Sequence, residues 1–261
     1  MKKMNKENRI KINKVKNLVK LTLSTSIEAV KEIELNIPQA EMDPNRVIAD
    51  LCEKINELNK DIKILKHMYI SDEQLQNNLK SKDILLDKKE KKMVYDWILK
   101  RMNSEGKRVQ MDLLYKLKGQ ENDSPSQFHS CCDGKGTTLT LIRTDRGYRC
   151  GGFTTQNWSS ANSGTNVSDP NAFLFSLDYK EQYLIYDTKN GNNAIYNYYG
   201  YGPCFGSTSD LYITGNCFQN YSSYSNFPYY YGGKSCFCRG LTGGYYNFKV
   251  DALEVYKISI V

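Results

Sequence analysis

The stretch FHSCCDGKGTTLTLIRTDRGYRCGGFT, residues 128–154, decides the fold of the second half of the chain. A short helix around His129 is predicted to stop at residues 133–134, where glycine follows aspartate. The runs TTLTLIRT and YRCGGFT are rich in strand-forming residues, and residues 145–147 separate them. Gly147 supplies the positive φ that a tight hairpin turn needs. The stretch therefore predicts a helix end followed by the first β-hairpin of an antiparallel domain.

Further strand patterns continue to the end of the chain. AFLFSLD and QYLIYD form a second hairpin pattern around residues 179–181, and AIYNY, DLYIT and YYNFKVDALEVYKISI add three or more strands. Because no helical pattern lies between these short strands, they favour a two-sheet antiparallel sandwich over a parallel α/β sheet. QNWSSANSGTNVSDPN, YGYGPCFGSTSD and QNYSSYSNFPYYYGGKSCFCRG are interpreted as long polar loops. Their tyrosines, asparagines and glycines are typical of binding loops.

The first half of the chain has a different pattern. Residues 43–69, DPNRVIADLCEKINELNKDIKILKHMY, start with helix-start chemistry and then repeat apolar residues at alternating spacings of three and four. Isoleucine at heptad position a, up to a final tyrosine, and leucine at position d predict a parallel two-stranded coiled coil. An amphipathic helix packed on its own domain is the alternative. The predicted seam consists of Ile48, Leu51, Ile55, Leu58, Ile62, Leu65 and Tyr69.

These patterns predict an α+β protein with two parts. Residues 1–80 form a helical region with the coiled coil at about 43–69. Residues 81–261 form the second domain, with helices in 81–134 and a β-sandwich in 135–261. Within 81–134, LLDKKEKKMVYDWILKRM has helical composition, and Trp97 is expected to anchor that helix in the core.

The net charge of +7 does not indicate a nucleic-acid binder. Residues 1–20 hold eight Lys or Arg and one Glu, so the rest of the chain sums to zero and lacks a basic face. No run of 18 apolar residues and no signal-peptide pattern is present, which predicts an intracellular, cytoplasmic protein without a transmembrane segment. The eight cysteines are therefore expected to be thiols, mostly buried.

Five ordered motifs resemble the TLDc domain, in the versions common in protists. FHSCCDGKGTTLTLIRTDRGYRCGGFT, DPNAFLFSLD, YGPCFGSTSDLYI, SYSNFP and YNFKVDALEVYKI occur at matching spacing, and the resemblance covers about residues 81–258. It implies two antiparallel sheets flanked by helices, with no accepted enzymatic reaction and no cofactor. Relatives in animals and fungi are linked to oxidative-stress protection, and several bind the vacuolar proton pump, the V-ATPase.

The family signature maps onto positions that are expected to be mostly architectural. The chain departs from the family pattern at residues 207–209, where relatives often carry glycines, and at Tyr256, where many carry tryptophan. The signature positions are Phe128, His129, Cys132, Asp133, Gly136, Gly151, Gly152, Phe153, Phe173, Phe175, Gly202, Phe205, Gly206, Asp210, Leu211 and Glu254.

Histidine and cysteine residues raise the question of a metal or redox site. His129, Cys131, Cys132, Cys236 and Cys238 include enough ligand types for zinc. Structural zinc sites, however, usually space paired cysteines by two to four residues, whereas these pairs are adjacent or separated by one. Buried thiols are therefore the favoured interpretation, and a redox-reactive thiol is the alternative.

Two further arrangements have both catalytic and structural interpretations. His129 and Asp133 resemble a base and its orienting carboxylate beside a Cys132 nucleophile, but one helical turn apart they also form a hydrogen bond that closes the helix. Asp210 and Glu254 form a carboxylate pair only if the fold brings them together. The glycines at 151–152 and 202–206 lack a phosphate-loop context and are interpreted as turn or bulge positions.

The sequence thus predicts a non-enzymatic interaction protein. Its coiled coil is expected to form a dimer, and the V-ATPase is the partner that the resemblance implies. Two alternatives stay open. One is a module that binds a glycan or other small molecule through the Tyr/Asn/Gly loops, and the other is a thiol-based antioxidant enzyme using Cys132 or the pair Cys236 and Cys238.

Overall fold

The computed structural model describes residues 70–261 except 86, 118–123, 186–191, 208 and 233–239, together with residues 53, 54, 56 and 57. The chain divides into units Met1–Ile62 and Lys63–Val261, and the fold presented here is that of the second. The predicted coiled-coil seam, as well as Cys236 and Cys238, lies outside the described residues.

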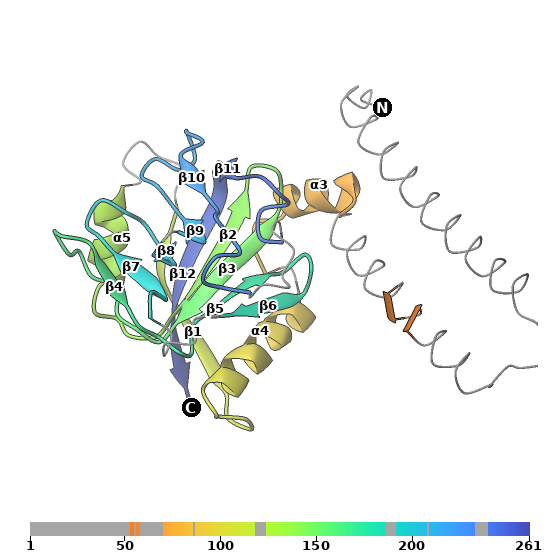
Figure 1. The fold of residues 1–261 in the computed structure, drawn as a ribbon, viewed down its shortest axis with the longest axis horizontal. Helices are drawn as coiled ribbons and strands as arrows, with labels where there is room; N and C mark the ends of the chain where they lie inside the picture. The colour runs from red at the N-terminus through yellow and green to blue at the C-terminus, as the bar shows by residue number, and fades with distance from the viewer. Residues whose placement is uncertain are drawn as a thin grey trace, which may run out of the picture. The chain divides into compact units, whose positions relative to one another are not determined.

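Two antiparallel six-stranded sheets form the domain (Figure 1). The helices are α3 (Asp72–Lys80), α4 (Lys88–Arg101) and α5 (Pro125–Cys132). Sheet A contains, in spatial order, β1 (Val109–Lys116), β12 (Val250–Ile260), β2 (Thr138–Thr144), β3 (Arg149–Thr154), β5 (Phe173–Ser176) and β6 (Glu181–Leu184). Sheet B contains β11 (Asn247–Phe248), β10 (Ser223–Tyr224), β9 (Leu211–Tyr212), β8 (Cys204–Phe205), β7 (Ile195–Asn197) and β4 (Thr165–Val167). The predicted α+β sandwich is confirmed.

Sheet A is the middle layer of three. On one face, Leu139 and Leu141 of β2 pack in a core with Val94 and Ile98 of α4. On the other face, Ile142 of β2 belongs to a second core that includes residues of sheet B. Every position of β2, β3 and β5 is buried because both faces of these strands are covered. Figure 1 shows α4 beside β5 and β6.

The predicted hairpins and the helix end are confirmed. Strands β2 and β3 pair in antiparallel register, and Gly147 in their turn has φ +87°. Strands β5 and β6 form the second hairpin. Helix α5 ends at Cys132, and the backbone N–H of Asp133 caps it by donating to the carbonyl of His129.

Four strands lie where the sequence did not predict them. Strand β1 falls inside the segment 81–134, which was predicted to be helical, and it pairs with β12 along its whole length. Strands β4, β8 and β10 fall inside the three segments interpreted as polar loops. The last three strands have only two or three residues, which is too short for an alternating pattern to be visible. Among the described residues, no helix is long and apolar enough to cross a membrane.

Candidate functional site

His129 connects α5 to the loop that follows β7. Its side chain is buried, with Nδ1 2.7 Å from Asp133 Oδ1 and Nε2 3.0 Å from the carbonyl oxygen of Tyr198. A carbonyl only accepts, so Nε2 donates to Tyr198. The second oxygen of Asp133 accepts a hydrogen bond from Ser160 Oγ at 2.7 Å. The contact predicted to close the helix is present, and both ring nitrogens of His129 are occupied by structural partners.

Cys132 is packed as an apolar side chain. It is fully buried in the core between the sheets, and burial raises the pKa of its thiol to about 12. A thiolate is the reactive form of cysteine, so this thiol is not activated. Burial likewise raises the pKa of Cys204 to about 12 and raises that of Cys150. Among the five described cysteines only Cys131 is partly exposed.

The described residues contain no group of three or more His, Cys, Asp or Glu side chains suited to a metal ion. His129, Cys131 and Cys132 therefore do not form a metal site with one another in the part of the chain that the structure covers. Their two predicted partners, Cys236 and Cys238, are not among the described residues.

The adjacent glycines of the signature lie inside β3 and not at a turn, but they do permit the close approach of neighbouring segments. A β-carbon at Gly152 would lie only 2.5–2.7 Å from ring atoms of Phe205 on β8 of sheet B. A β-carbon at Gly151 would collide with the carbonyl of Thr140 and would lie 2.6 Å from Phe175 Cζ. Glycine is needed here because the two sheets and the adjacent strand approach closely. Gly206, by contrast, does occupy a turn, with φ +81°.

The aromatic residues of the signature are divided between the two cores. They pack inside the domain and do not converge on a cleft, which supports an architectural role. Phe128, Phe205 and Leu211 lie in the core between the sheets, and Phe153, Phe173 and Phe175 lie in the core under α4.

Asp210 holds the loop that contains Tyr229, Tyr230 and Tyr231. Its carboxylate accepts backbone N–H groups of these residues at 2.6 to 3.5 Å. Burial raises the pKa of Asp210 to about 6, and the three N–H groups oppose that increase. The carboxylate thus acts as an anchor for the loop.

Glu254 lies on β12 and has different partners from Asp210. Lys116 Nζ is 2.7 Å from Glu254 Oε1, and the Tyr256 hydroxyl donates to Oε2 at 2.9 Å. Tyr256 packs against the core under α4, on the face of sheet A that is remote from sheet B. Asp210 belongs to the sheet B side, so the fold does not bring the two carboxylates together as a pair.

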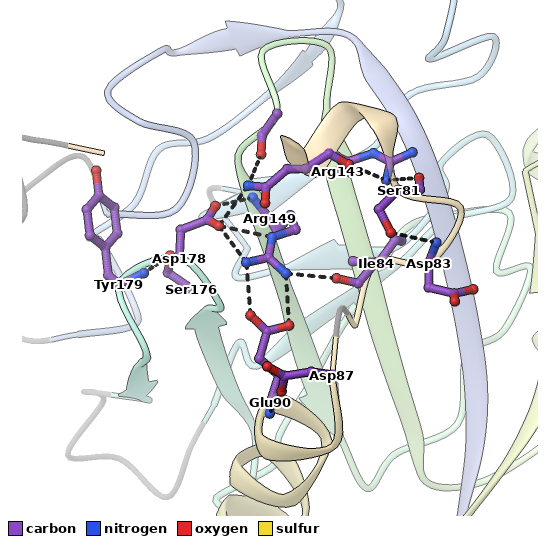
Figure 2. A network of polar contacts seen from close by, with 12 residues as sticks. Ser81, Asp83, Ile84, Asp87, Glu90, Arg143, Arg149, Ser176, Asp178 and Tyr179 are labelled. Atoms are coloured by element: carbon purple, nitrogen blue, oxygen red, sulfur yellow. Dashed lines mark hydrogen bonds and ion pairs between the residues drawn. The ribbon is translucent and has the colours of Figure 1, made fainter. Parts of the chain in front are cut away.

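The largest buried ionic group was not predicted. Arg149 of β3 is almost fully buried and forms a bidentate pair with Glu90 of α4, at 2.9 and 3.0 Å (Figure 2). It also contacts Asp178 Oδ1 at 2.9 Å, and its backbone N–H donates to Oδ2. Burial raises the pKa of Asp178, whereas the Arg149 guanidinium opposes that rise. This group fixes α4 to sheet A.

A second arginine attaches α3 to the same sheet (Figure 2). Arg143 donates to the carbonyls of Asn78 and Ser81 at 2.8 and 2.7 Å and pairs with Asp251 at 2.6 Å. Asn78 in turn donates to the Gly147 carbonyl at 2.7 Å. Helix α3 therefore belongs structurally with the sandwich although it precedes residue 81. The signal in the sequence was a pair of arginines inside strands that carry no other charged residue.

Tyrosines occupy the face of sheet B that points away from sheet A. Along β9, Leu211 belongs to the core between the sheets, so Tyr212 points to the opposite face. Cross-strand pairing places it beside Cys204 and Tyr224. In strand order from β4 to β11, the outward positions are Asn166, Tyr196, Cys204, Tyr212, Tyr224 and Asn247.

Tyrosines from the adjoining loops extend this row. Centroid distances of 4.5 to 5.9 Å connect the rings into one series. The two ends, Tyr199 and Tyr246, are 52% and 55% exposed, whereas Tyr212 in the middle is nearly buried. The set, termed the tyrosine face, consists of Tyr196, Tyr198, Tyr199, Tyr201, Tyr212, Tyr224 and Tyr246.

Comparison with known proteins identifies one family. The model of the TLDc domain matches residues 79–259, which is more than half of the chain. No curated protein matches the chain. The match begins inside α3 and ends at the penultimate residue of β12, so it covers strands of both sheets and includes Arg143 and Arg149.

Proposed function

Because the chain belongs to the TLDc domain family, we propose that it is a non-enzymatic interaction protein linked to protection against oxidative stress. The observation that carries the proposal is the placement of the signature residues. They fill two cores, close a helix and anchor a loop, while exposed tyrosines at the two ends of the tyrosine face offer an area for contact. These features support a function by binding.

The proposed partner is the cytosolic sector of the V-ATPase, as the family resemblance implies. The test is a binding measurement between the full-length chain and that sector purified from the source cell. We expect saturable binding that persists when Cys132 is replaced by Ala, because no thiol chemistry is involved. Absence of binding at micromolar concentrations of both proteins would remove this partner.

We also propose that residues 43–69 make the protein a parallel dimer and present one domain per chain. The repeating isoleucines and leucines of the seam support this. Light scattering on the full chain is expected to give about twice the monomer mass of 30.0 kDa. Leu58→Lys in the seam should yield the monomer mass, whereas Glu57→Lys outside the seam should not. A monomer mass for the unaltered chain would exclude the dimer.

A further inference from the structure

We propose that the tyrosine face is a binding site for a neutral polysaccharide. This inference goes beyond the proposed protein interaction and does not depend on it. The face combines partly exposed aromatic rings with hydroxyl and amide groups on one side of sheet B. Sugar rings present the matching chemistry, because their C–H faces stack on aromatic rings and their hydroxyls exchange hydrogen bonds with polar side chains.

The first support is the accessibility of the rings at the two ends. The ring of Tyr246 stacks on Tyr224 at an interplanar angle of 13° with a centroid distance of 5.4 Å. Since Tyr246 is 55% exposed, its other face stays open to solvent. At the opposite end, Tyr199 is 52% exposed and contacts Tyr198. Tyrosines held in this way offer contact area with little rotamer entropy to lose.

The second support is the absence of charge in this part of the sequence. Between residues 192 and 233 there are ten tyrosines and a single charged residue, Asp210, which is buried under its loop. Burial raises the pKa of Tyr201 and Tyr212, so their hydroxyls stay protonated at neutral pH. A face of this kind lacks the Lys and Arg side chains that bind phosphates or acidic sugars.

The charged residues near the β11 end of the sheet have other aromatic partners. Arg146 Cζ lies 3.8 Å from the centroid of the Tyr245 ring, and Lys249 Nζ lies 4.7 Å from that of Tyr221. The Tyr221 hydroxyl donates to Asp145 at 2.9 Å. These contacts form a separate cluster, and among the described residues no cation lies over a ring of the tyrosine face.

The third support is the lack of exposed aliphatic side chains on this face. Among the described residues, the large exposed hydrophobic residues other than tyrosines are Leu113, Leu184 and Val261. All three lie on or next to strands of sheet A. The centre of a protein interface is usually enriched in Met and Arg as well as in aromatic residues. Exposed amides at Asn166 and Asn247 instead place hydrogen-bonding groups at both ends of the row.

The test measures binding of the full-length chain to cellohexaose, laminarihexaose, chitohexaose and maltohexaose by titration calorimetry, with a heparin hexasaccharide as the acidic comparison. We expect at least one neutral oligosaccharide to bind, with an affinity that changes little with salt because no ion pairs form. The double variant Tyr199→Ser, Tyr246→Ser should weaken that affinity about tenfold. Tyr199→Phe with Tyr246→Phe should weaken it less, because the rings remain.

The matched control is Tyr229→Ser. Tyr229 is 63% exposed but contacts Tyr230 and not the tyrosine face, so its replacement should leave the affinity unchanged. The proposal is overturned if no neutral oligosaccharide binds, if only the heparin fragment binds, or if the double variant and the control behave alike. It is also overturned if the double variant loses binding to the V-ATPase sector and not to a sugar, since the face is then a protein interface.

Discussion

The two sheets of the sandwich differ in strand length and in what packs against their faces. Sheet A has strands of four to eleven residues, and α4 and sheet B cover its two faces. Sheet B has strands of two or three residues, and tyrosines occupy its outer face. Buried arginines fix the helices on sheet A, whereas a single buried carboxylate, Asp210, anchors a loop of sheet B. The difference assigns the larger share of the buried ionic contacts to sheet A and supports the proposal that sheet B supplies the surface for contact.

The largest effect is expected where sheet A holds α4. Arg149→Met removes the guanidinium that pairs with two buried carboxylates, Glu90 and Asp178. The free energy of unfolding should fall by about 4 kcal/mol. When one partner of a buried ion pair is removed, the attraction that offset the desolvation of the remaining charge is lost. Urea unfolding monitored by circular dichroism measures this loss.

The matched control lies on the same helix. Lys92 and Asp96 form an ion pair at 2.6 Å, with side chains that are 74% and 58% exposed. Lys92→Met should change the stability little, since water already solvates both charges. If Arg149→Met and Lys92→Met cost the same, the buried group does not hold α4 as described.

A smaller effect is expected where the two sheets meet. Gly152→Ala places a methyl group against the Phe205 ring, and overpacking should cost about 2 kcal/mol. Adding Phe205→Leu should recover part of this loss, because the smaller side chain makes room. A double-mutant cycle checks the coupling, and strict additivity of the two changes would show that the contact does not limit the approach of the sheets.

Sequence predicted the local features of this fold. The helix end at His129 and Asp133 and the hairpin turn at Gly147 depend on residues within one turn of each other, so their spacing is visible in the chain. Strands β4, β8 and β10 were missed because two or three residues show no period. Strand β1 was missed because it was assigned to a helical segment and its pairing partner, β12, is remote in sequence.

The candidate sites were harder to predict because they join distant segments. Arg149 meets Glu90 across 59 positions and Asp178 across 29 positions. The Tyr/Asn/Gly composition indicated binding loops, but only the strand pairing shows that Tyr212 and Tyr224 lie side by side. The composition thus predicted which residue types form the tyrosine face, whereas their positions on it depend on the strand pairing.

On the sheet B side, Asp210 should make stability depend on pH. Its folded pKa of about 6 lies above the ordinary value of 3.8, so the folded state binds a proton more readily than the unfolded state between these values. Proton binding by Asp210 therefore adds to the stability of the folded state. The added stability is fully present below pH 3.8 and is lost as pH rises through 6. Stability should therefore fall by about 1 kcal/mol from pH 5 to 7 on account of this group.

Comparison with Asp210→Asn isolates this effect. The variant should be less stable overall, because its amide nitrogen cannot accept the backbone N–H of Tyr230. Its unfolding free energy, measured by urea titration at several pH values, should lack the fall assigned to Asp210. A variant with the same pH profile as the unaltered chain would assign the titration to another group.

The smallest effect is expected at Cys132, next to Cys131 on α5. Burial in the core and a pKa of about 12 keep the Cys132 thiol protonated and inaccessible, while Cys131 is partly exposed. Iodoacetamide at pH 8 should therefore modify Cys131 and spare Cys132 in the folded chain, as peptide mass mapping can show, and guanidinium should make both react. Equal labelling of both cysteines in the folded chain would mean that the core around α5 opens. Peroxide consumption that Cys132→Ala abolishes would mean that the Cys132 thiol performs chemistry.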